Sequence, residues 1–380
     1  MKKWFFVLFF VSPLACQTIC LDMIVKNESS CILTCLESVK DWIDYWVIVD
    51  TGSTDGTQKL IRDFLKDIPG ELHERKWVNF EHNRNEAYQL AQSKADYCLF
   101  IDADEKLIFS RGASFPPLNC DSYQVIVDEP KGTHYHRILL VKNRLNWRWV
   151  GAIHEAIVSS EAKTSELLKG ITNFSDTTKG DRSRDPNKYL KDAKILEEEL
   201  KKDPTNARNV FFLGQSYLSA NDLPKALQSF EKRAQMGGWD QEAFYAKYMA
   251  AHLQEKLNLA PEIFIQNYKA AHQFRPSRAE PLYELAKYYI RNRLYEDGYA
   301  VLKKAIALPI SSDAIFVTRW IYEWGALYLF AECCAQLGKL EELQDVLRQL
   351  LGCENLPLEK RRKVEGLLSN ASLFKTNRSD

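Results

Sequence analysis

The sequence predicts an α/β domain followed by an all-α domain of helical repeats. From Ile19 to about Asp128, short apolar runs alternate with helical patterns, which is typical of βαβ units and a mostly parallel sheet. Beyond Asn187 the apolar spacing is helical nearly to the end of the chain, and small and aromatic residues recur. A chain of 380 residues has room for both domains.

The α/β prediction rests on apolar runs of strand length separated by amphipathic helical patterns. The five predicted strands cover Ile19–Val25, Trp46–Val49, Leu72–Lys76, Tyr97–Ile101 and Tyr123–Val127. The three predicted helices cover Cys31–Val39, Gly56–Leu65 and Asn85–Ser93. From Thr133 to Val158 the chain becomes aromatic and β-prone, which predicts a hairpin or a small sheet.

The repeat prediction rests on units that combine small and aromatic residues. Phe212-Leu213-Gly214 with Tyr217 resembles the tetratricopeptide pattern, in which a small residue lets the two helices of one repeat pack closely. Glu284-Leu285-Ala286 returns about two repeat lengths later. A related unit lies between them at Tyr245–Phe274, and a weaker fourth unit spans Phe330–Leu351. An unrelated helical bundle is the alternative.

Composition places the domain boundary in a polar stretch. Ser175–Asp185 is polar, charged and glycine-containing, as expected for a linker or mobile loop. The resulting map has a hydrophobic segment at 1–18, an α/β domain at 19–174, a linker at 175–186, helical repeats at 187–352, and a C-terminal helix and tail at 353–380.

The charge balance excludes one class of partner. Lys plus Arg and Asp plus Glu both number 51, and the sequence has no basic block. The strong, salt-dependent attraction of a nucleic-acid binder therefore has no source, and no nucleic-acid partner is expected.

A loop with acidic and small residues follows the second predicted strand. An acidic residue at the carboxyl end of a parallel strand, here Asp50, faces the crevice in which open α/β sheets bind ligands. Asp50 can accept hydrogen bonds from a nucleoside there. Ser53, Thr54 or Asp55 can cap the helix that follows. The alternative is a turn and a helix cap with no ligand.

Three carboxylates follow the apolar strand Tyr97–Ile101. Side chains two residues apart on an extended chain point to the same side, so Asp102 and Asp104 can face one ligand site, with Glu105 next to them. Oxygen ligands of this kind suit Mg²⁺ or Mn²⁺, which would bridge a diphosphate. The alternative is a solvated exit from the strand.

These residues occur in the order seen in family 2 glycosyltransferases with the GT-A fold, and the resemblance covers about residues 19–160. The segments that carry it are 23–28 (MIVKNE), 49–57 (VDTGSTDGT), 83–87 (NRNEA) and 100–105 (FIDADE). Residues 146–155 (NWRWVGAIHE) also resemble the Trp-x-Gly-x-x-His-Glu segment of a bacterial subgroup that is fused to tetratricopeptide repeats.

The resemblance implies a role for each matching residue. Asp50 would contact the base or ribose, Arg84 the nucleotide, and Asp102 the ribose. Asp104 would hold the metal ion that binds the diphosphate. The implied nucleotide-binding set is Asn27, Asp50, Ser53, Asp55, Arg84 and Asp102. Asn27 has an equally good structural interpretation, as a surface residue at the entry of a helix.

His154 and Glu155 are the candidates for proton transfer. Inverting transfer needs a base that takes the acceptor's proton. We assign Glu155 as this base and His154 as third metal ligand or acceptor contact. The reverse assignment stays open, because the sequence lacks the family's Glu-Asp pair further downstream. A packed or capping role is the alternative for His154.

The resulting hypothesis is an inverting, metal-dependent glycosyltransferase with a UDP-sugar donor and Mn²⁺ or Mg²⁺ as cofactor. The helical repeats would hold a peptide or protein, as acceptor or as partner, on a concave face. Two other classes stay open: a repeat-based interaction scaffold whose transferase domain is idle, and a nucleotidyltransferase.

The N-terminal segment bears on location. Met1-Lys2-Lys3 and the apolar run Trp4–Cys16 are typical of a secretory signal, and the run is too short for a transmembrane span. The alternative is an uncleaved extension that packs on the first domain or touches a membrane. Because nucleotide sugars are cytosolic in bacteria, we expect a cytoplasmic protein, with membrane association through this segment left open.

Overall fold

The computed structural model describes residues 17–129, 133–176, 178, 180, 182 and 185–376. Most of the predicted N-terminal hydrophobic segment therefore lies outside the described residues. Contacts divide the chain into two compact units. The α/β unit comprises Met1–Ile126, Arg137–Gly151 and Glu155–Asp181, and the helical unit comprises Val127–His136, Ala152–His154 and Arg182–Asp380. The last junction falls within the stretch 175–186, whose role as a linker stays a prediction.

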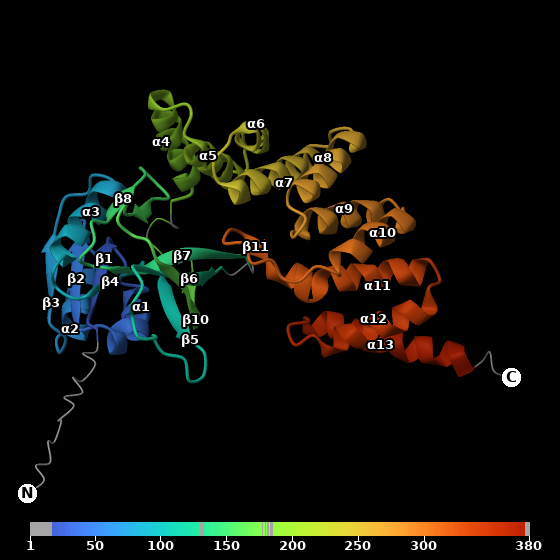
Figure 1. Ribbon diagram of the computed structural model, residues 1–380, viewed down its shortest axis with the longest axis horizontal. Helices are drawn as coiled ribbons and strands as arrows, with labels where there is room; N and C mark the ends of the chain where they lie inside the picture. Colours follow the sequence, from blue (N-terminus) through green and yellow to red (C-terminus); the bar gives the residue numbers. More distant parts are fainter. Residues whose placement is uncertain are drawn as a thin grey trace, which may run out of the picture. The chain divides into compact units, whose positions relative to one another are not determined.

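The α/β unit contains all five predicted strands and all three predicted helices (Figure 1). Its strands are β1 Ile19–Val25, β2 Tyr45–Asp50, β3 Gly70–Glu74, β4 Tyr97–Phe100, β5 Glu105–Phe109, β6 Ser122–Asp128, β7 Thr133–Lys142, β8 Arg148–Val150, β9 Ala156–Val158 and β10 Ser165–Ser175. Its helices are α1 Ile32–Val39, α2 Thr57–Phe64, α3 Phe80–Ala91 and a 3₁₀ turn at Lys40–Trp42. Helix α3 begins earlier than predicted because the Asn79 side chain caps it by accepting from the His82 N–H.

The main sheet has the strand order β3-β2-β1-β4-β7-β6-β10-β5. Strands β3, β2, β1 and β4 are parallel, and β7 runs antiparallel to β4. The prediction of a separate hairpin at 133–158 was therefore wrong for β7, whose buried Leu139, Leu140 and Val141 complete the main sheet. Only β8 and β9 form a small hairpin. Strands β5 and β10 were not predicted.

The topology reverses at β1, which pairs with β2 on one side and with β4 on the other. Helix α3 covers one face of these strands, where Tyr88 and Ala91 pack with Cys20, Cys98 and Phe100. Helix α1 lies against β5 and α2. Ligands of open α/β sheets bind at such a switch point, beyond the carboxyl ends of the strands.

The helical unit consists of helices that pack in consecutive pairs (Figure 1). The helices are α4 Lys188–Lys202, α5 Ala207–Ser219, α6 Leu223–Gln235, α7 Asp240–Lys256, α8 Pro261–Phe274, α9 Glu280–Arg291, α10 Tyr295–Ala305, α11 Ala326–Gln336, α12 Leu340–Gly352 and α13 Leu358–Thr376. The pairs α5–α6, α7–α8, α9–α10 and α11–α12 coincide with the four predicted repeat units, which confirms the repeat interpretation. Among the residues that the structure describes, no helix combines the length and apolar character needed to cross a membrane.

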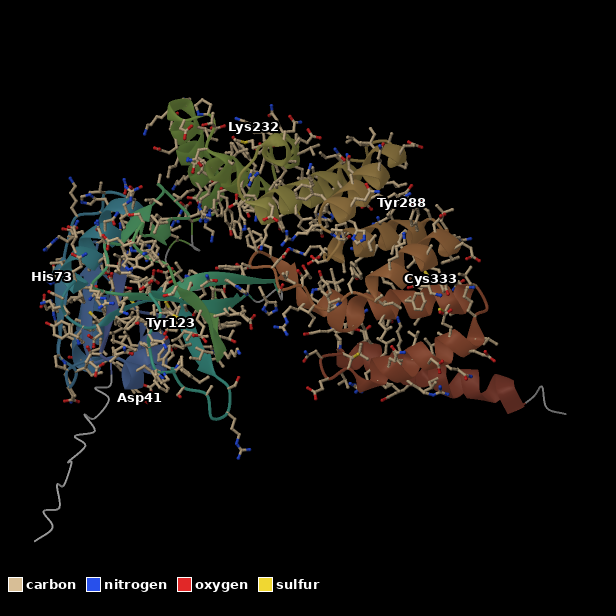
Figure 2. The ribbon with its side chains drawn as sticks, viewed as in Figure 1. Asp41, His73, Tyr123, Lys232, Tyr288 and Cys333 are labelled. Carbon is tan, nitrogen blue, oxygen red and sulfur yellow. The ribbon has the colours of Figure 1, made fainter. Side chains whose placement is uncertain are left out.

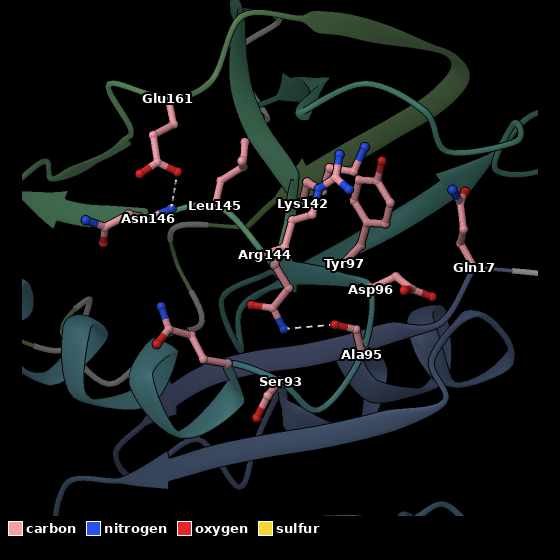
Figure 3. Close-up of a pocket in the computed structure, with 12 residues that line it drawn as sticks. Gln17, Ser93, Ala95, Asp96, Tyr97, Lys142, Arg144, Leu145, Asn146 and Glu161 are labelled. Carbon is pink, nitrogen blue, oxygen red and sulfur yellow. Dashed lines mark hydrogen bonds between the residues drawn. The ribbon is translucent and has the colours of Figure 1, made fainter.

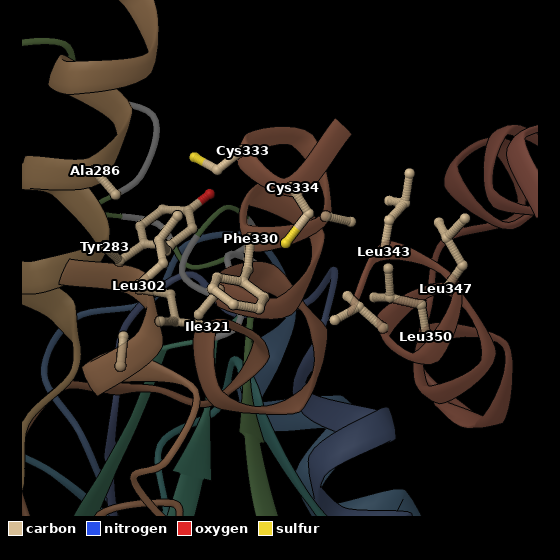
Figure 4. Packing of buried hydrophobic residues seen from close by; sticks show 14 of the residues in the cluster. Tyr283, Ala286, Leu302, Ile321, Phe330, Cys333, Cys334, Leu343, Leu347 and Leu350 are labelled. Carbon is tan, nitrogen blue, oxygen red and sulfur yellow. The ribbon is translucent and has the colours of Figure 1, made fainter. Parts of the chain in front are cut away.

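The apolar side chains of the helix pairs form several buried clusters. In the last pairs, Tyr283, Leu302, Phe330 and Leu347 meet in one buried cluster (Figure 4). The side chains of both units are drawn in Figure 2, where fully buried Tyr123 belongs to the α/β unit and fully buried Cys333 to the helical unit.

A glycine explains the close approach of α5 and α6. A Cβ at Gly214 would lie 3.0 Å from Phe230 Cε1, tighter than ordinary packing allows. We expect Gly214→Leu to lower the free energy of unfolding by about 1–3 kcal/mol, because overpacking displaces the Phe230 ring. Gly352→Leu is the control, since no atom lies within 4 Å of its added Cβ. Urea denaturation of both variants checks this; equal stability would contradict the role of Gly214.

An insertion between α10 and α11 was not visible in the sequence. It contains a π-helical turn at Ile321–Gly325 and strand β11 (Val317–Thr318), which pairs with Thr133 and His134, the part of β7 that belongs to the helical unit. Fully buried Arg278 donates to the carbonyl oxygens of Ile315 and Phe316 and pairs with Glu280 and Asp313. These contacts hold the insertion on the helices of the same unit.

Candidate active site

Asp50 ends β2 and is fully buried. Its Oδ1 accepts from the backbone N–H groups of Gly52 (2.9 Å) and Ser53 (2.8 Å) and from Gln58 Nε2 (3.1 Å). Within the described part of the chain, no donor reaches its buried Oδ2. Because buried polar atoms are nearly always hydrogen-bonded, this oxygen suits a donor group of a bound ligand.

Asn27, Ser53 and Asp55 tie the ends of β1 and β2 together. Ser53 Oγ accepts from the Asn27 N–H at 2.8 Å, and Asn27 Oδ1 accepts from the Thr54 N–H at 2.8 Å. Asp55 accepts from the Thr57 hydroxyl at 2.6 Å and its N–H at 3.1 Å. Burial opposes ionisation of Asp55, but the hydrogen bonds outweigh it and hold its pKa below the usual value. The structure thus gives these three residues a bracing role in the loop; ligand contact by them stays a prediction.

Asp102 begins a tight turn after β4. The Glu105 N–H donates to the Asp102 carbonyl at 3.0 Å, and the Asp102 N–H donates to Glu105 Oε2 at 3.0 Å. Arg137 on β7 clamps the buried Glu105 carboxylate through Nη1 (2.8 Å) and Nη2 (2.5 Å), and its Nη1 lies 3.6 Å from Asp102 Oδ2. The Cys35 thiol of α1 donates to the Asp102 carbonyl oxygen at 3.3 Å.

Arg84 on α3 connects two of the predicted site residues. Its Nη2 donates to Asp102 Oδ1 at 2.7 Å, its Nε donates to Glu155 Oε1, and its guanidinium lies over the Trp149 ring. Burial opposes ionisation of Asp102, but the charges of Arg84 and Arg137 lower its pKa below the usual value. Arg84 therefore joins Asp102 and Glu155 in one hydrogen-bonded network.

Helix α3 also holds the segment that leads to Glu155. The Asn85 side chain accepts from the Trp149 N–H at 2.8 Å and donates to the Trp149 carbonyl at 2.9 Å. Glu81 Oε2 accepts from the Gly151 N–H at 2.9 Å. One face of α3 thus aligns the predicted segments 83–87 and 146–155.

His154 belongs to the helical unit, unlike the neighbouring Glu155. Its ring stacks on Phe212 of α5. The surrounding protein desolvates the His154 imidazole and lowers its pKa below the usual value, so the ring is neutral near pH 7. Part of the residue is still exposed to solvent. No contact among the described residues joins His154 to Asp104, and its role as a metal ligand stays a prediction.

Asp104 differs from its neighbours because Arg84 and Arg137 do not pair with it. Burial, and the nearby carboxylates of Asp102, Glu105 and Glu28, raise the pKa of Asp104 to about 7. Gly180 approaches it so closely that an added Cβ would lie 2.9 Å from Asp104 Oδ2. A divalent cation would relieve this excess of negative charge. Within the described ranges, no three His, Cys, Asp or Glu side chains gather as a complete metal cluster, so a cation here needs oxygens from a ligand.

Four residues of this site were missed at the sequence level: Glu81, Asn85, Arg137 and Trp149. Asn85 and Trp149 stood inside the matched segments but had no assigned role. Arg137 gave one signal, a charged residue inside a β-prone run, yet only the strand pairing of β7 brings it to Glu105.

A cavity lies elsewhere in the α/β unit (Figure 3). It has a volume of about 740 Å³ and is lined by residues that include Gln17, Asp96, Tyr97, Arg144 and Glu161. Tyr97 is the first residue of β4, so this cavity lies at the amino ends of the strands. None of the predicted site residues lines it, and its position is not the one at which open sheets bind nucleotides.

Part of the α/β unit matches a known protein family. Residues 21–108 match the family model of glycosyl transferase family 2. The SPbeta prophage-derived glycosyltransferase SunS of Bacillus subtilis is 26% identical over 236 residues, which cover 57% of this chain and 54% of SunS. A TPR repeat-containing protein of Synechococcus elongatus is 36% identical over 95 residues, 25% of this chain and 22% of that protein. The matched part of the chain thus spans about half the length of SunS and 22% of the length of the TPR repeat-containing protein.

Among solved structures, the crystal structure of MamA is similar over 48% of this chain and 96% of MamA, with a TM-score of 0.37 and 17% sequence identity. A likeness of this size carries no argument about fold or function. The helix pairs of the chain itself define its second half. The chain therefore combines an α/β unit in which residues 21–108 match glycosyl transferase family 2 with tetratricopeptide-like helical repeats.

Proposed function

We propose that this protein transfers a sugar from a UDP-sugar donor to an acceptor, with inversion at the anomeric carbon. The observation that supports this most is a pair of unsatisfied groups at one edge of the sheet. No donor among the described residues reaches the buried Oδ2 of Asp50, and burial together with nearby carboxylates raises the pKa of Asp104. Asp50 ends β2 and Asp104 follows β4, the two strands that flank β1. A nucleotide would supply the missing donor, and a cation the missing charge.

Asp104 is the residue that we expect to hold Mn²⁺ or Mg²⁺, together with oxygens of the donor diphosphate. Carboxylate and phosphate oxygens are the ligands that these ions prefer. The cation would offset the charge that develops on the departing diphosphate. Because the charge of Asp102 is already paired with Arg84, we expect Asp102 to accept a hydrogen bond from a ribose hydroxyl and not to hold the cation.

Glu155 is proposed as the base. Its Oε1 accepts from Arg84, while Oε2 makes no hydrogen bond to another described residue, so Oε2 can take the acceptor's proton. His154, whose ring is neutral, is the alternative base. Proton transfer by a positioned side chain contributes about 10²–10⁴ in rate.

The acceptor is proposed to be a peptide or protein held by the helical repeats, whose stacked helix pairs offer an extended surface. Part of that surface is already covered. The Phe316 ring lies 6.1 Å from that of Phe211 on α5 and 4.9 Å from that of Tyr245 on α7. We therefore expect the acceptor to contact other residues of the repeats.

Donor hydrolysis with a panel of nucleotide sugars tests this proposal. We expect the purified protein to hydrolyse one or more of UDP-glucose, UDP-galactose and UDP-N-acetylglucosamine in Mn²⁺, and to lose this activity in EDTA. The matched GDP-sugars serve as a control for recognition of the nucleobase, since a site that is specific for uracil discriminates against guanine. Full hydrolysis in chelator, without gain on adding Mn²⁺ or Mg²⁺, would contradict the metal requirement. No hydrolysis of any donor would favour an idle domain, and release of pyrophosphate a nucleotidyltransferase.

A further inference from the structure

Helix α5 holds the tip of the loop that carries Glu155. The rings of Phe212 and His154 stack with centroids 4.2 Å apart and planes 10° apart. Arg208, one helical turn before Phe212, donates from Nη2 to the His154 carbonyl oxygen at 3.0 Å. The same guanidinium lies over the Phe212 ring, 4.8 Å from its centroid. Both the ring and the backbone of His154 are therefore held by one helix.

The backbone of His154 adopts a conformation that needs such support. Its φ is +52°, in the left-handed region that residues with a Cβ rarely adopt. A strained conformation of this kind persists only where the surrounding structure fixes it, and such positions cluster at functional sites. The stack on Phe212 and the hydrogen bond from Arg208 supply that fixation.

The residues on either side of this tip have contacts within the α/β unit. Glu81 accepts from the Gly151 N–H, and Arg84 donates to the Glu155 carboxylate, so α3 holds both of them. His154 itself belongs to the helical unit, in which α5 holds it. Because His154 and Glu155 share a peptide bond, a change in the His154 backbone would redirect the Glu155 side chain.

We propose that Phe212 and Arg208 are positioning residues for glycosyl transfer, which hold His154 and thereby orient the Glu155 carboxylate. This inference rests on the proposed function, because it uses the role of Glu155 toward the acceptor's proton. A base must lie within hydrogen-bond reach of the proton that it takes. A misplacement of about 1 Å can lower a rate by about 100-fold. The first helix pair thus serves catalysis as well as binding.

A purely structural role for the stack makes different predictions. Loss of the Phe212 ring would then lower the melting temperature and leave turnover by the folded protein unchanged. The positioning role instead predicts that turnover falls while affinity for the donor stays the same, since donor contacts lie with Asp50, Asp102 and Asp104.

The test compares Phe212→Ala with Phe212→Tyr, which keeps the ring, in the full-length protein. Phe274→Ala is the matched control, because Phe274 on α8 also carries a cation over its ring, Lys247 at 5.3 Å, and is 47% exposed. Two quantities are measured for each variant: hydrogen–deuterium exchange of the peptide 149–158, and turnover with the UDP-sugar that the unmodified protein hydrolyses. Calorimetry with the same UDP-sugar and Mn²⁺ gives the donor affinity.

We expect Phe212→Ala to raise exchange in 149–158 and to lower turnover by about 10- to 100-fold at unchanged donor affinity. Phe212→Tyr should restore both quantities, and Phe274→Ala should alter neither. Unchanged exchange in Phe212→Ala would overturn the inference, as would raised exchange with unchanged turnover. If the unmodified protein hydrolyses no donor, the proposed function fails, and the exchange measurement then decides by itself whether α5 holds the loop.

Discussion

Replacing Asp104 by Asn is expected to abolish measurable sugar transfer. The amide keeps the size of the side chain but removes the charge that would hold the cation on the diphosphate. Electrostatic stabilisation of this kind is often worth roughly 3–4 kcal/mol in the transition state. Initial rates and calorimetric binding of the UDP-sugar in Mn²⁺ measure the effect, and we expect donor affinity to fall with the rate.

Glu155→Gln is the comparison variant. Its amide oxygen can still accept from Arg84, so donor binding should stay nearly intact, whereas loss of the base should slow transfer by about 10²–10⁴. If Glu155→Gln loses donor binding as Asp104→Asn does, Glu155 belongs to the nucleotide site, and His154 becomes the first candidate for the base.

The same Asp104 substitution should stabilise the fold at alkaline pH. Burial and the nearby carboxylates raise the pKa of Asp104 from its ordinary value of 3.8 to about 7, so the folded state holds the proton more tightly than the unfolded chain. Ionised Asp104 therefore destabilises the fold as pH rises from about 4 to about 7. The melting temperature of Asp104→Asn should exceed that of the unmodified protein at pH 8 and match it near pH 4. A lower melting temperature at pH 8 would contradict this charge crowding.

Replacing Arg84 by Met is expected to produce the largest loss of stability in the α/β unit, about 3–5 kcal/mol. The change leaves the carboxylates of Asp102 and Glu155 without their shared cation, and the Glu155 side chain is only 9% exposed. Few other losses leave buried charge so poorly compensated.

The control is Arg75→Met, which breaks a half-exposed pair with Glu86 of the same helix α3. A partly solvated pair of this kind contributes about 0–1 kcal/mol. Urea unfolding followed by tryptophan fluorescence measures both variants. Equal losses would show that water solvates the Arg84 network as well as it solvates the Arg75 pair.

The pattern of residues within short segments of the chain accounts for the part of the fold that was predicted correctly. Apolar runs such as Ile19–Val25 have strand length and form buried strands. The small residue Gly214, followed by Tyr217, identified a helix pair, and a Cβ at Gly214 would meet the Phe230 ring. Strand β10 was missed because two of the alternate residues that are buried near its end, Asn173 and Ser175, are polar, so the apolar signal is weak.

The candidate site also has a part that the sequence predicts and a part that it does not. The position of Asp50 at a strand end follows from one apolar run and the residue after it. Its two oxygens, however, have different partners, since Oδ1 is bound by its own loop and Oδ2 is not. No sequence pattern distinguishes two oxygens of one carboxylate.

By itself, the sequence determined the two-part architecture and placed Asp50, Asp102 and Asp104 at or just after the ends of predicted strands. These features depend on periodicity and on residues close together in the chain, whereas Arg84 became a candidate only through the resemblance to family 2 glycosyltransferases. Only the tertiary structure decided which charges are paired: Arg84 with Asp102 and Glu155, and Arg137 with Glu105, leaving Asp104 without either arginine. It also decided that α5 holds His154. The physical reason is that ion pairing and stacking depend on distances between segments far apart in sequence, which strand order and helix packing set and which local patterns do not encode.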